Sequence, residues 1–332
     1  MPAEWEPHEG IWLAWPKDPV TFPNRVEKVQ HLYCEMMAHL SRGEKVFLLV
    51  DDAAVKKNVL HRLKESEANC DNILIHILPT VDVWIRDYGP NFLVKKTTSG
   101  KKEVAFNHWI FNAWGKKYEE LAADTDIPKK LAPILNLKSF EPEIILEGGS
   151  IEVNGEGVCL TTKQCLLNKN RNPHLNQNEI ENVLKEYLGI DEIFWLNEGV
   201  EGDDTDGHID DIARFVAPHI VVCAVEEDSK DKNYKTSQEN YEILKSRFDT
   251  IPLPMPGVVA GEEGRLPASY ANFLVTNESV LVPIFNHKND GKALGLLKEL
   301  FPNRQIVGLN CSDLIWGMGA IHCVTQQQPS KF

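Results

Sequence analysis

The chain repeats one pattern, in which a polar turn that carries glycine and charged residues leads into an apolar strand. The pattern occurs at 84–94, 147–160, 207–225, 268–284 and around Cys323. Helix-like segments lie between most of these stretches, and a short apolar strand follows each of them. One unit of this kind cannot bury its apolar face alone, so the repeat predicts neighbouring units that pack on one another.

This repeat predicts an α/β fold of about five strand–helix–strand units. The expected helices are 25–40, 53–64, 176–188, 238–248 and 292–300, and the expected strands beside them are 10–15, 45–50, 73–78, 192–196, 251–253, 305–308 and 320–325. The first and last strands can pair, which would close a ring, hide two sheet edges and bring the five turns together. One open α/β sheet is the alternative.

The chain shows no sign of division into separate domains. No linker rich in Gly, Ser or Pro interrupts it, so we expect 1–332 to be a single catalytic domain. The proline-rich stretch that begins at Pro252 and continues to Gly264 is expected to be one mobile loop.

The charge balance limits the class of partner. The net charge is −14 at pH 7, with acidic residues spread along the chain. This disfavours nucleic acid and anionic membranes and suits a small cation, although solubility alone would also explain it. The seven cysteines are irregularly spaced, which indicates reduced thiols. The N-terminal stretch lacks the apolar core of a signal peptide and no apolar run is long enough to span a bilayer, so we expect a cytoplasmic protein.

Cys323 is the candidate nucleophile. It follows the glycine-containing segment 316–320 and precedes the polar residues 325–328. An ionised thiol there can attack an electrophile, whereas a free cysteine is also among the most buried residue types and can be core. Neighbours in a strand point to opposite faces, so His322 is not expected to serve Cys323, and an acid/base must come from elsewhere.

The repeated turns supply the other reactive groups. An extended backbone would place His208 and Asp210 on one face, where they can act as acid/base, hold a cation or bind a metal; a solvated acidic loop is the alternative. Asp87 adjoins Arg86 and a Gly-Pro turn, which Asp87 could simply cap. Glu147 lies between an apolar run and two glycines, and a carboxylate buried there needs a partner such as histidine.

The motifs of common cofactor and nucleophile sites are missing. The sequence has no HExxH or CxxC spacing for zinc, no GxGxxG after a strand, no P-loop and no GxSxG elbow. His208, Asp210 and Asp87 remain an alternative ligand set for a hard cation. We expect no cofactor and no metal.

Seven motifs carry a family resemblance. They lie at 1–8, 82–90, 111–115, 146–150, 170–174, 207–210 and 321–327. In these letters and in this order they resemble the agmatine deiminase family, which includes the bacterial type of peptidylarginine deiminase. The resemblance implies the pentein fold, a five-bladed pseudo-fivefold α/β propeller. It also implies a cofactor-free hydrolase that converts agmatine to N-carbamoylputrescine and ammonia, in putrescine biosynthesis.

The resemblance also implies catalytic roles. Cys323 resembles the nucleophile, His208 the general acid/base, and Glu147 the carboxylate that orients the histidine. Asp87 and Asp210 resemble the clamps that bind the guanidinium. Carboxylates around Cys323 should raise the pKa of its thiol in the empty enzyme, and a bound guanidinium should reverse this effect.

The remaining expected contacts concern the substrate. Trp84 resembles a pocket wall, and Trp114, in the motif 111–115, is expected to bind substrate as well. Asp204 is expected to receive the amine of agmatine. Arg86 would instead bind the carboxylate of arginine or of a peptide C-terminus.

Three departures from the family pattern bear on the substrate. Met318 and Ala320 stand where a run of three glycines and an asparagine is common, Lys116 stands where a second glycine is common, and the segment after Trp15 also differs. These departures leave the chemistry intact and concern the non-reacting end of the substrate. The alternatives are deimination of arginine or peptidylarginine, amidinotransfer, and a catalytically silent binding protein. We expect the ligand to be a small cationic guanidine. The expected oligomeric state, which remains to be tested, is a homodimer.

Overall fold

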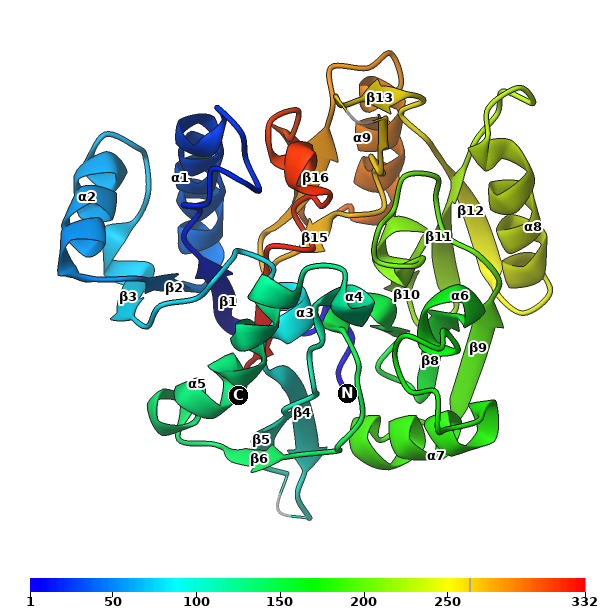
Figure 1. Cartoon of the computed structure of the whole chain (residues 1–332), viewed down its shortest axis with the longest axis horizontal. Coiled ribbons are helices and arrows are strands. Elements are labelled where there is room, and N and C mark those ends of the chain that lie inside the picture. Colours follow the sequence, from blue (N-terminus) through cyan, green and yellow to red (C-terminus); the bar gives the residue numbers. More distant parts are fainter. Residues whose placement is uncertain (99, 263, 332) are drawn as a thin grey trace.

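The computed structural model describes residues 1–98, 100–262 and 264–331, and these residues form short β-sheets flanked by helices (Figure 1). The sheets, written in strand order, are β18 (Gln326–Pro329), β1 (His8–Ala14), β2 (Lys45–Val50) and β3 (Ile73–Ile77); β4 (Asn91–Lys96), β5 (Lys102–Asn107) and β6 (Lys138–Phe140); β7 (Glu152–Val153), β8 (Val158–Thr162) and β9 (Glu192–Leu196); β10 (Ala213–Ala217), β11 (Ile220–Val225) and β12 (Asp249–Pro254); β15 (Leu274–Val275), β16 (Ser279–Ile284) and β17 (Gln305–Asn310); and the small hairpin β13 (Val259–Ala260) with β14 (Arg265–Leu266).

The longer helices connect strands within these sheets, and several of the short ones lie between sheets. The longer ones are α1 (Val26–Gly43), α2 (Ala53–Lys64), α5 (Ile127–Leu135), α7 (Gln177–Leu188), α8 (Asn233–Lys245) and α9 (Asp290–Leu300); the short ones are α3 (Ile85–Tyr88), α4 (Ala113–Lys116) and α6 (Lys163–Leu166), with 3₁₀ helices η1 (Cys70–Asn72), η2 (Glu119–Asp126), η3 (Gly148–Ser150), η4 (Ile209–Asp211) and η5 (Leu314–Gly317). Figure 1 shows the longer helices at the periphery, with α3 and α4 near the middle of the view.

The predicted repeat is present in the sheet pairing. In each larger sheet two strands form an antiparallel pair, and the next strand along the chain, reached through a helical connection, adds in parallel. The first and last strands make the corresponding pair: β1 is antiparallel to β18 and parallel to β2. The C-terminal strand therefore joins the N-terminal unit, as the sequence predicted, and the single open sheet is excluded by the separate sheets.

Helix α7 illustrates how the sequence produces these elements. Its Asn176 and Glu179 form a capping box, and Gly189 ends the helix with φ of 65°. Ile180, Leu184 and Leu188 recur every four residues and are buried. Burying each such side chain contributes roughly 1.5–3 kcal/mol, so this face fixes the helix on its sheet.

Two sequence expectations are wrong locally. The segment 320–325 is a series of turns, and the strand begins only at Gln326; the turn lets His322 and Cys323 engage different partners. The proline-rich loop begins later than expected, because Pro252 and Pro254 lie within β12, which pairs in parallel with β11. Prolines are tolerated there because β12 is at the edge of its sheet. No helix in the described part of the chain has both the length and the apolar character needed to cross a membrane.

Candidate active site

The site is built around Cys323, on the turn between η5 and β18. Its side chain is 8% exposed, and its thiol donates a hydrogen bond to Asp210 Oδ2 at 3.7 Å. Burial raises the pKa of Cys323 well above its ordinary value, and the carboxylates of Asp210, Asp211 and Asp87 raise it further. The direction is the one predicted for an empty site.

His208 lies in a cluster that only a glycine permits. A Cβ at Gly149 would lie 2.7 Å from His208 Nδ1, 2.9 Å from Asp87 Oδ1 and 3.1 Å from Asp210 Oδ2. The Gly149 N–H donates to Asp87 Oδ1 at 2.9 Å, and His208 Nδ1 lies 3.8 Å from the same oxygen. The structure thus brings the predicted Asp87 together with His208 and Asp210, which come from a distant turn.

The electrostatics of this cluster suit an acid/base. Burial lowers the pKa of His208, but Asp87, Cys165 and Glu147 outweigh it and raise the pKa well above the ordinary value. Burial also raises the pKa of Asp87, although the adjacent His208 opposes this. A histidine held cationic by carboxylates can donate a proton to a leaving group. One expectation about the backbone is wrong: residues 209–211 form η4 and are not extended.

Glu147 is anchored by an arginine that the sequence analysis did not assign. Arg171 Nε donates to Glu147 Oε1 at 2.6 Å, and Arg171 Nη1 donates to Asp206 Oδ2 at 2.8 Å. Glu147 Oε2 is buried and has no hydrogen-bond partner among the described residues. Glu147, Cys165 and His208 each offer an atom within 4.8 Å of the others.

The spacing of Glu147, Cys165 and His208 would suit a metal ion, but the positive charge beside Glu147 favours another role. The Arg171 guanidinium beside Glu147 would repel a cation and leaves one carboxylate oxygen for the histidine.

Asp210 is held by a second histidine. His322 Nδ1 lies 2.7 Å from Asp210 Oδ2, and His322 Nε2 lies 2.9 Å from Glu4 Oε2. Glu4 also pairs with Arg214 at 2.8 Å. Burial opposes ionisation of Asp210, but the His322 contact holds the pKa of Asp210 below its ordinary value. As predicted, His322 does not contact Cys323; it fixes the clamp instead.

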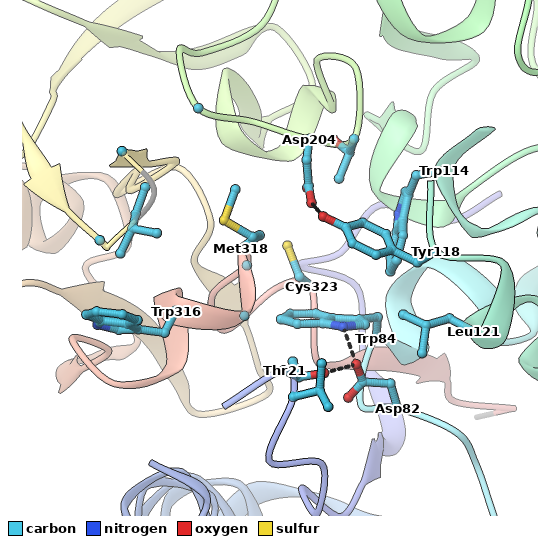
Figure 2. Close-up of a pocket in the computed structure, with 18 of the residues that line it drawn as sticks. Thr21, Asp82, Trp84, Trp114, Tyr118, Leu121, Asp204, Trp316, Met318 and Cys323 are labelled. Carbon is cyan, nitrogen blue, oxygen red and sulfur yellow. Dashed lines mark hydrogen bonds between the residues drawn. The ribbon is translucent and has the colours of Figure 1, made fainter. Parts of the chain in front are cut away.

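A cavity of about 700 Å³ opens onto Cys323. Its wall includes the predicted residues Trp84, Asp87, Trp114, Asp204 and Cys323. Figure 2 shows the sulfur of Cys323 between Trp84 and Met318, with Asp204 across from Trp84. His208, Asp210 and Glu147 are not part of the cavity lining and lie buried behind it.

The tryptophan wall is oriented by hydrogen bonds. Trp84 Nε1 donates to Asp82 Oδ2 at 3.0 Å, and Thr21 Oγ1 donates to the same oxygen at 2.7 Å (Figure 2). Trp114 Nε1 donates to Asp87 Oδ2 at 2.9 Å. Both indoles are therefore fixed as flat apolar surfaces beside the thiol, which suits a planar cation with a hydrocarbon chain.

Asp204 is in place to meet a second positive charge. Its Oδ2 accepts a hydrogen bond from Tyr118 Oη at 2.6 Å (Figure 2). Burial raises the pKa of Asp204 to about 6, despite the lowering effect of Tyr118.

Arg86 lies away from the cavity. Its guanidinium donates to the His322 carbonyl at 3.2 Å and to Gln327 Oε1 at 2.7 Å, and it lies 3.8 Å from Glu4 Oε2. It is absent from the cavity lining, so its position does not support the expected contact with a substrate carboxylate. The Arg86 guanidinium instead binds Gln327 in the C-terminal strand β18.

Two departures from the family pattern are strained positions. Met318 has φ of 74° and lines the cavity. Lys116 has φ of 66° and belongs to α4, in which all of Ala113, Trp114, Gly115 and Lys116 have positive φ. Left-handed backbone costs roughly 1–2 kcal/mol per residue outside glycine, and such strain is concentrated at functional sites.

Comparison with known proteins agrees with this geometry. Residues 1–329 match the model of the Porphyromonas-type peptidyl-arginine deiminase family. The agmatine deiminase of Ectopseudomonas mendocina is 37% identical over 99% of this chain and 95% of its own. The solved agmatine deiminase of Enterococcus faecalis superposes with a TM-score of 0.92 at 32% identity, covering 100% of this chain and 96% of its own.

A substrate-bound structure is also similar. The agmatine deiminase of Campylobacter jejuni with substrate bound has a TM-score of 0.88 at 33% identity, and the match covers 99% of this chain and 96% of that one. The match of the family model over nearly the whole chain settles the family. The chain belongs to the Porphyromonas-type peptidyl-arginine deiminase family.

Proposed function

We propose that the protein is a cysteine-dependent deiminase that hydrolyses the guanidinium of agmatine to N-carbamoylputrescine and ammonia. The observation that carries this proposal is the meeting of Cys323, Asp87 and the pair His208 and Asp210 beside one cavity, although they come from three distant stretches of the sequence. The similar agmatine deiminases from three genera support the choice of substrate.

The proposal includes the architecture. We infer that the five larger sheets are the blades of a pseudo-fivefold propeller, closed by the pairing of β1 with β18, and that 1–332 is one catalytic domain without a cofactor. The repeated strand order and that terminal pairing support it. We further propose a cytoplasmic enzyme that binds neither nucleic acid nor membrane, in keeping with its net charge of −14. The homodimer stays a prediction.

The first half of the reaction forms a covalent intermediate. Asp87 and Asp210 bind the planar guanidinium through charge-assisted hydrogen bonds and hold its carbon over Cys323. The cation cancels the carboxylate charge, so the thiol releases its proton to solvent and the thiolate attacks the carbon. His208 gives its proton to the departing nitrogen. Ammonia leaves, and an amidino–thioether remains on Cys323.

The second half regenerates the enzyme. The neutral His208, oriented by Glu147, takes a proton from water, and the hydroxide adds to the amidino carbon. The tetrahedral centre collapses with rupture of the carbon–sulfur bond, and its hydroxyl proton is lost. The carbamoyl product leaves and the electron pair returns to the Cys323 sulfur.

The cavity lining favours an amine over a carboxylate at the non-reacting end of the substrate. Asp204 belongs to this lining, whereas Arg86 is buried elsewhere with its own partners. A substrate with a terminal amine gains an ion pair with Asp204, whereas a free arginine carboxylate would be repelled.

The test compares substrates on one enzyme. Ammonia release is measured with agmatine, arginine and a peptide ending in arginine, with no added amine so that amidinotransfer gives no signal. We expect agmatine to be turned over with the highest kcat/KM. Cys323→Ser should abolish turnover while agmatine still raises its melting temperature. A higher kcat/KM for arginine than for agmatine would show that arginine is the preferred substrate. A Cys323 that forms no adduct with a haloacetamidine would refute the deiminase proposal.

A further inference from the structure

Asn272 is a buried residue in direct contact with the Cys323 sulfur. It lies just before β15 and has no exposed surface (0%). Its side-chain Oδ1 accepts the backbone N–H of His322 at 3.0 Å and that of Cys323 at 3.3 Å. Its side-chain Nδ2 lies 3.1 Å from Cys323 Sγ and donates to it.

These contacts fix the orientation of the amide. The His322 N–H also reaches the Asn272 backbone carbonyl at 3.2 Å, but the Cys323 N–H needs Oδ1 as its acceptor, so Oδ1 must face the turn. A flipped amide would set Nδ2 against two donors and place an oxygen against the sulfur. Asn272 is therefore a permanent donor to Cys323 Sγ, whichever protonation state the thiol adopts.

The other polar side chains around the sulfur are acidic, and a backbone hydrogen bond with Ala320 opposes their effect on the pKa of Cys323. The thiol donates to Asp210 Oδ2, and once the proton has left, that contact is between two negative charges. The Asn272 donor behaves in the opposite way, because a hydrogen bond to an ionised acceptor is stronger than one to a neutral acceptor. Asn272 thus offsets part of the repulsion that the clamps impose on the nucleophile.

We propose that Asn272 is a catalytic residue whose side-chain amide stabilises the Cys323 thiolate, both before it attacks the guanidinium carbon and when the carbon–sulfur bond breaks. Asn272 forms no covalent bond and transfers no proton. The proposal rests on Cys323 being the nucleophile of the proposed deiminase and adds the group that makes the thiolate accessible in an acidic pocket.

The experiment reads thiol ionisation separately from turnover. The rate of iodoacetamide alkylation of the Cys323 peptide is followed by mass spectrometry from about pH 6 to 10 in wild type, Asn272→Asp and Asn272→Ala. Asn272→Asp keeps an oxygen for the two backbone donors and places a carboxylate against the sulfur. Asn240→Ala is the matched control, because Asn240 is 2% exposed and its Nδ2 donates to the Glu198 carbonyl, away from the site.

We expect both Asn272 variants to shift the alkylation profile to higher pH and to lower kcat/KM for agmatine about 100-fold, as for removal of one oxyanion donor. Asn240→Ala should keep the wild-type profile. A wild-type alkylation profile in Asn272→Ala would show that the amide does not stabilise the thiolate and would overturn the proposal. Alkylation needs no substrate. A wild-type protein that does not turn over agmatine would therefore refute the proposed function, whereas the role of Asn272 would still be decided by the alkylation profiles.

A measurement on the unaltered sequence covers the case in which the variants do not fold. The side-chain ¹⁵N–¹H signals of Asn272 should titrate together with the Cys323 thiol and should lose this titration in Cys323→Ser. Side-chain signals that do not respond to ionisation of Cys323 would contradict the proposal.

Discussion

Single residues set the charge of the site before any substrate arrives. Cys323 is buried among carboxylates that disfavour its thiolate, while His208 is surrounded by groups that favour its cation. In the proposed reaction a guanidinium bound by Asp87 and Asp210 reverses the first effect, while Cys165 and Glu147 still favour the His208 cation. Substrate binding then activates the nucleophile at the moment when the acid is already protonated.

Asp204 carries the first prediction at this scale. Its pKa of about 6 means that it loses its charge as the pH falls through that value, so kcat/KM for agmatine should drop at acid pH through a rise in KM. Asp204→Asn should lower kcat/KM by about tenfold or more at neutral pH and remove this acid limb. The check is a pH profile of kcat/KM.

Tyr118 provides the control for that assignment. Its hydrogen bond lowers the pKa of Asp204, so Tyr118→Phe should move the acid limb to higher pH. An Asp204→Asn enzyme with the wild-type specificity constant for agmatine would show that the amine binds elsewhere.

Among the elements, the short segment α4 joins both ends of the site. Trp114 donates to the clamp Asp87, and the neighbouring Gly115 packs on Asn170. Asn170 Nδ2 donates to Asp206 Oδ2, which also accepts from Arg171. The left-handed turn thereby holds a clamp directly and reaches Glu147 through Arg171.

Gly115→Ala tests this segment. The new Cβ would lie 2.3 Å from Asn170 Nδ2, at a φ of 83° that alanine rarely adopts. We expect a loss of stability of roughly 2 kcal/mol or more, from the left-handed backbone and the clash together, and a fall in kcat of about tenfold. Thermal unfolding and steady-state kinetics measure the two effects.

Gly295→Ala is the matched control. Gly295 lies inside α9 with nothing within 4 Å of its added Cβ, so alanine there should stabilise the helix by roughly 0.5–1 kcal/mol and leave kcat unchanged. If Gly115→Ala behaved in the same way, α4 would have no part in holding the site.

The whole molecule is tied together at its centre by the N-terminal segment. Glu4 contacts His322 next to the nucleophile, Arg214 in β10 and the Val275 N–H of β15, at 2.7–2.9 Å. Burial raises the pKa of Glu4, but Arg214 and His322 outweigh it and hold the pKa well below the ordinary value. Segments from both chain ends and from two inner units therefore share one carboxylate.

Glu4→Gln tests this connection. It preserves the shape of the side chain and removes one of the two carboxylates that pair with the buried Arg214, the other being Glu152. We expect destabilisation of about 3 kcal/mol, seen in chemical denaturation, with a fall in kcat because Asp210 loses the support of His322. Glu227→Gln, which breaks an ion pair with Lys292 between side chains that are 74% and 63% exposed, should leave both quantities unchanged. An equal, small effect of the two substitutions would contradict the role of Glu4.

The sequence by itself determined the repeated units and the pairing of the ends of the chain, and it indicated the candidate reactive groups. Apolar periodicity and turn residues are local signals, so α2, β2 and β9 have the bounds that were predicted from them. Motifs likewise identified Cys323, His208, Asp87, Asp210 and Glu147 as candidates.

Only the tertiary structure decided which partner each of these groups has. It joined Glu147 to Arg171, Asp210 to His322 and Cys323 to Asn272, and it drew Arg86 away from the cavity. These contacts span 24 to 241 positions of the chain, and no local pattern encodes them. The physical reason is that a buried charge takes its partner from whichever segment folding brings within hydrogen-bond distance, and that distance is set by the packing of whole units.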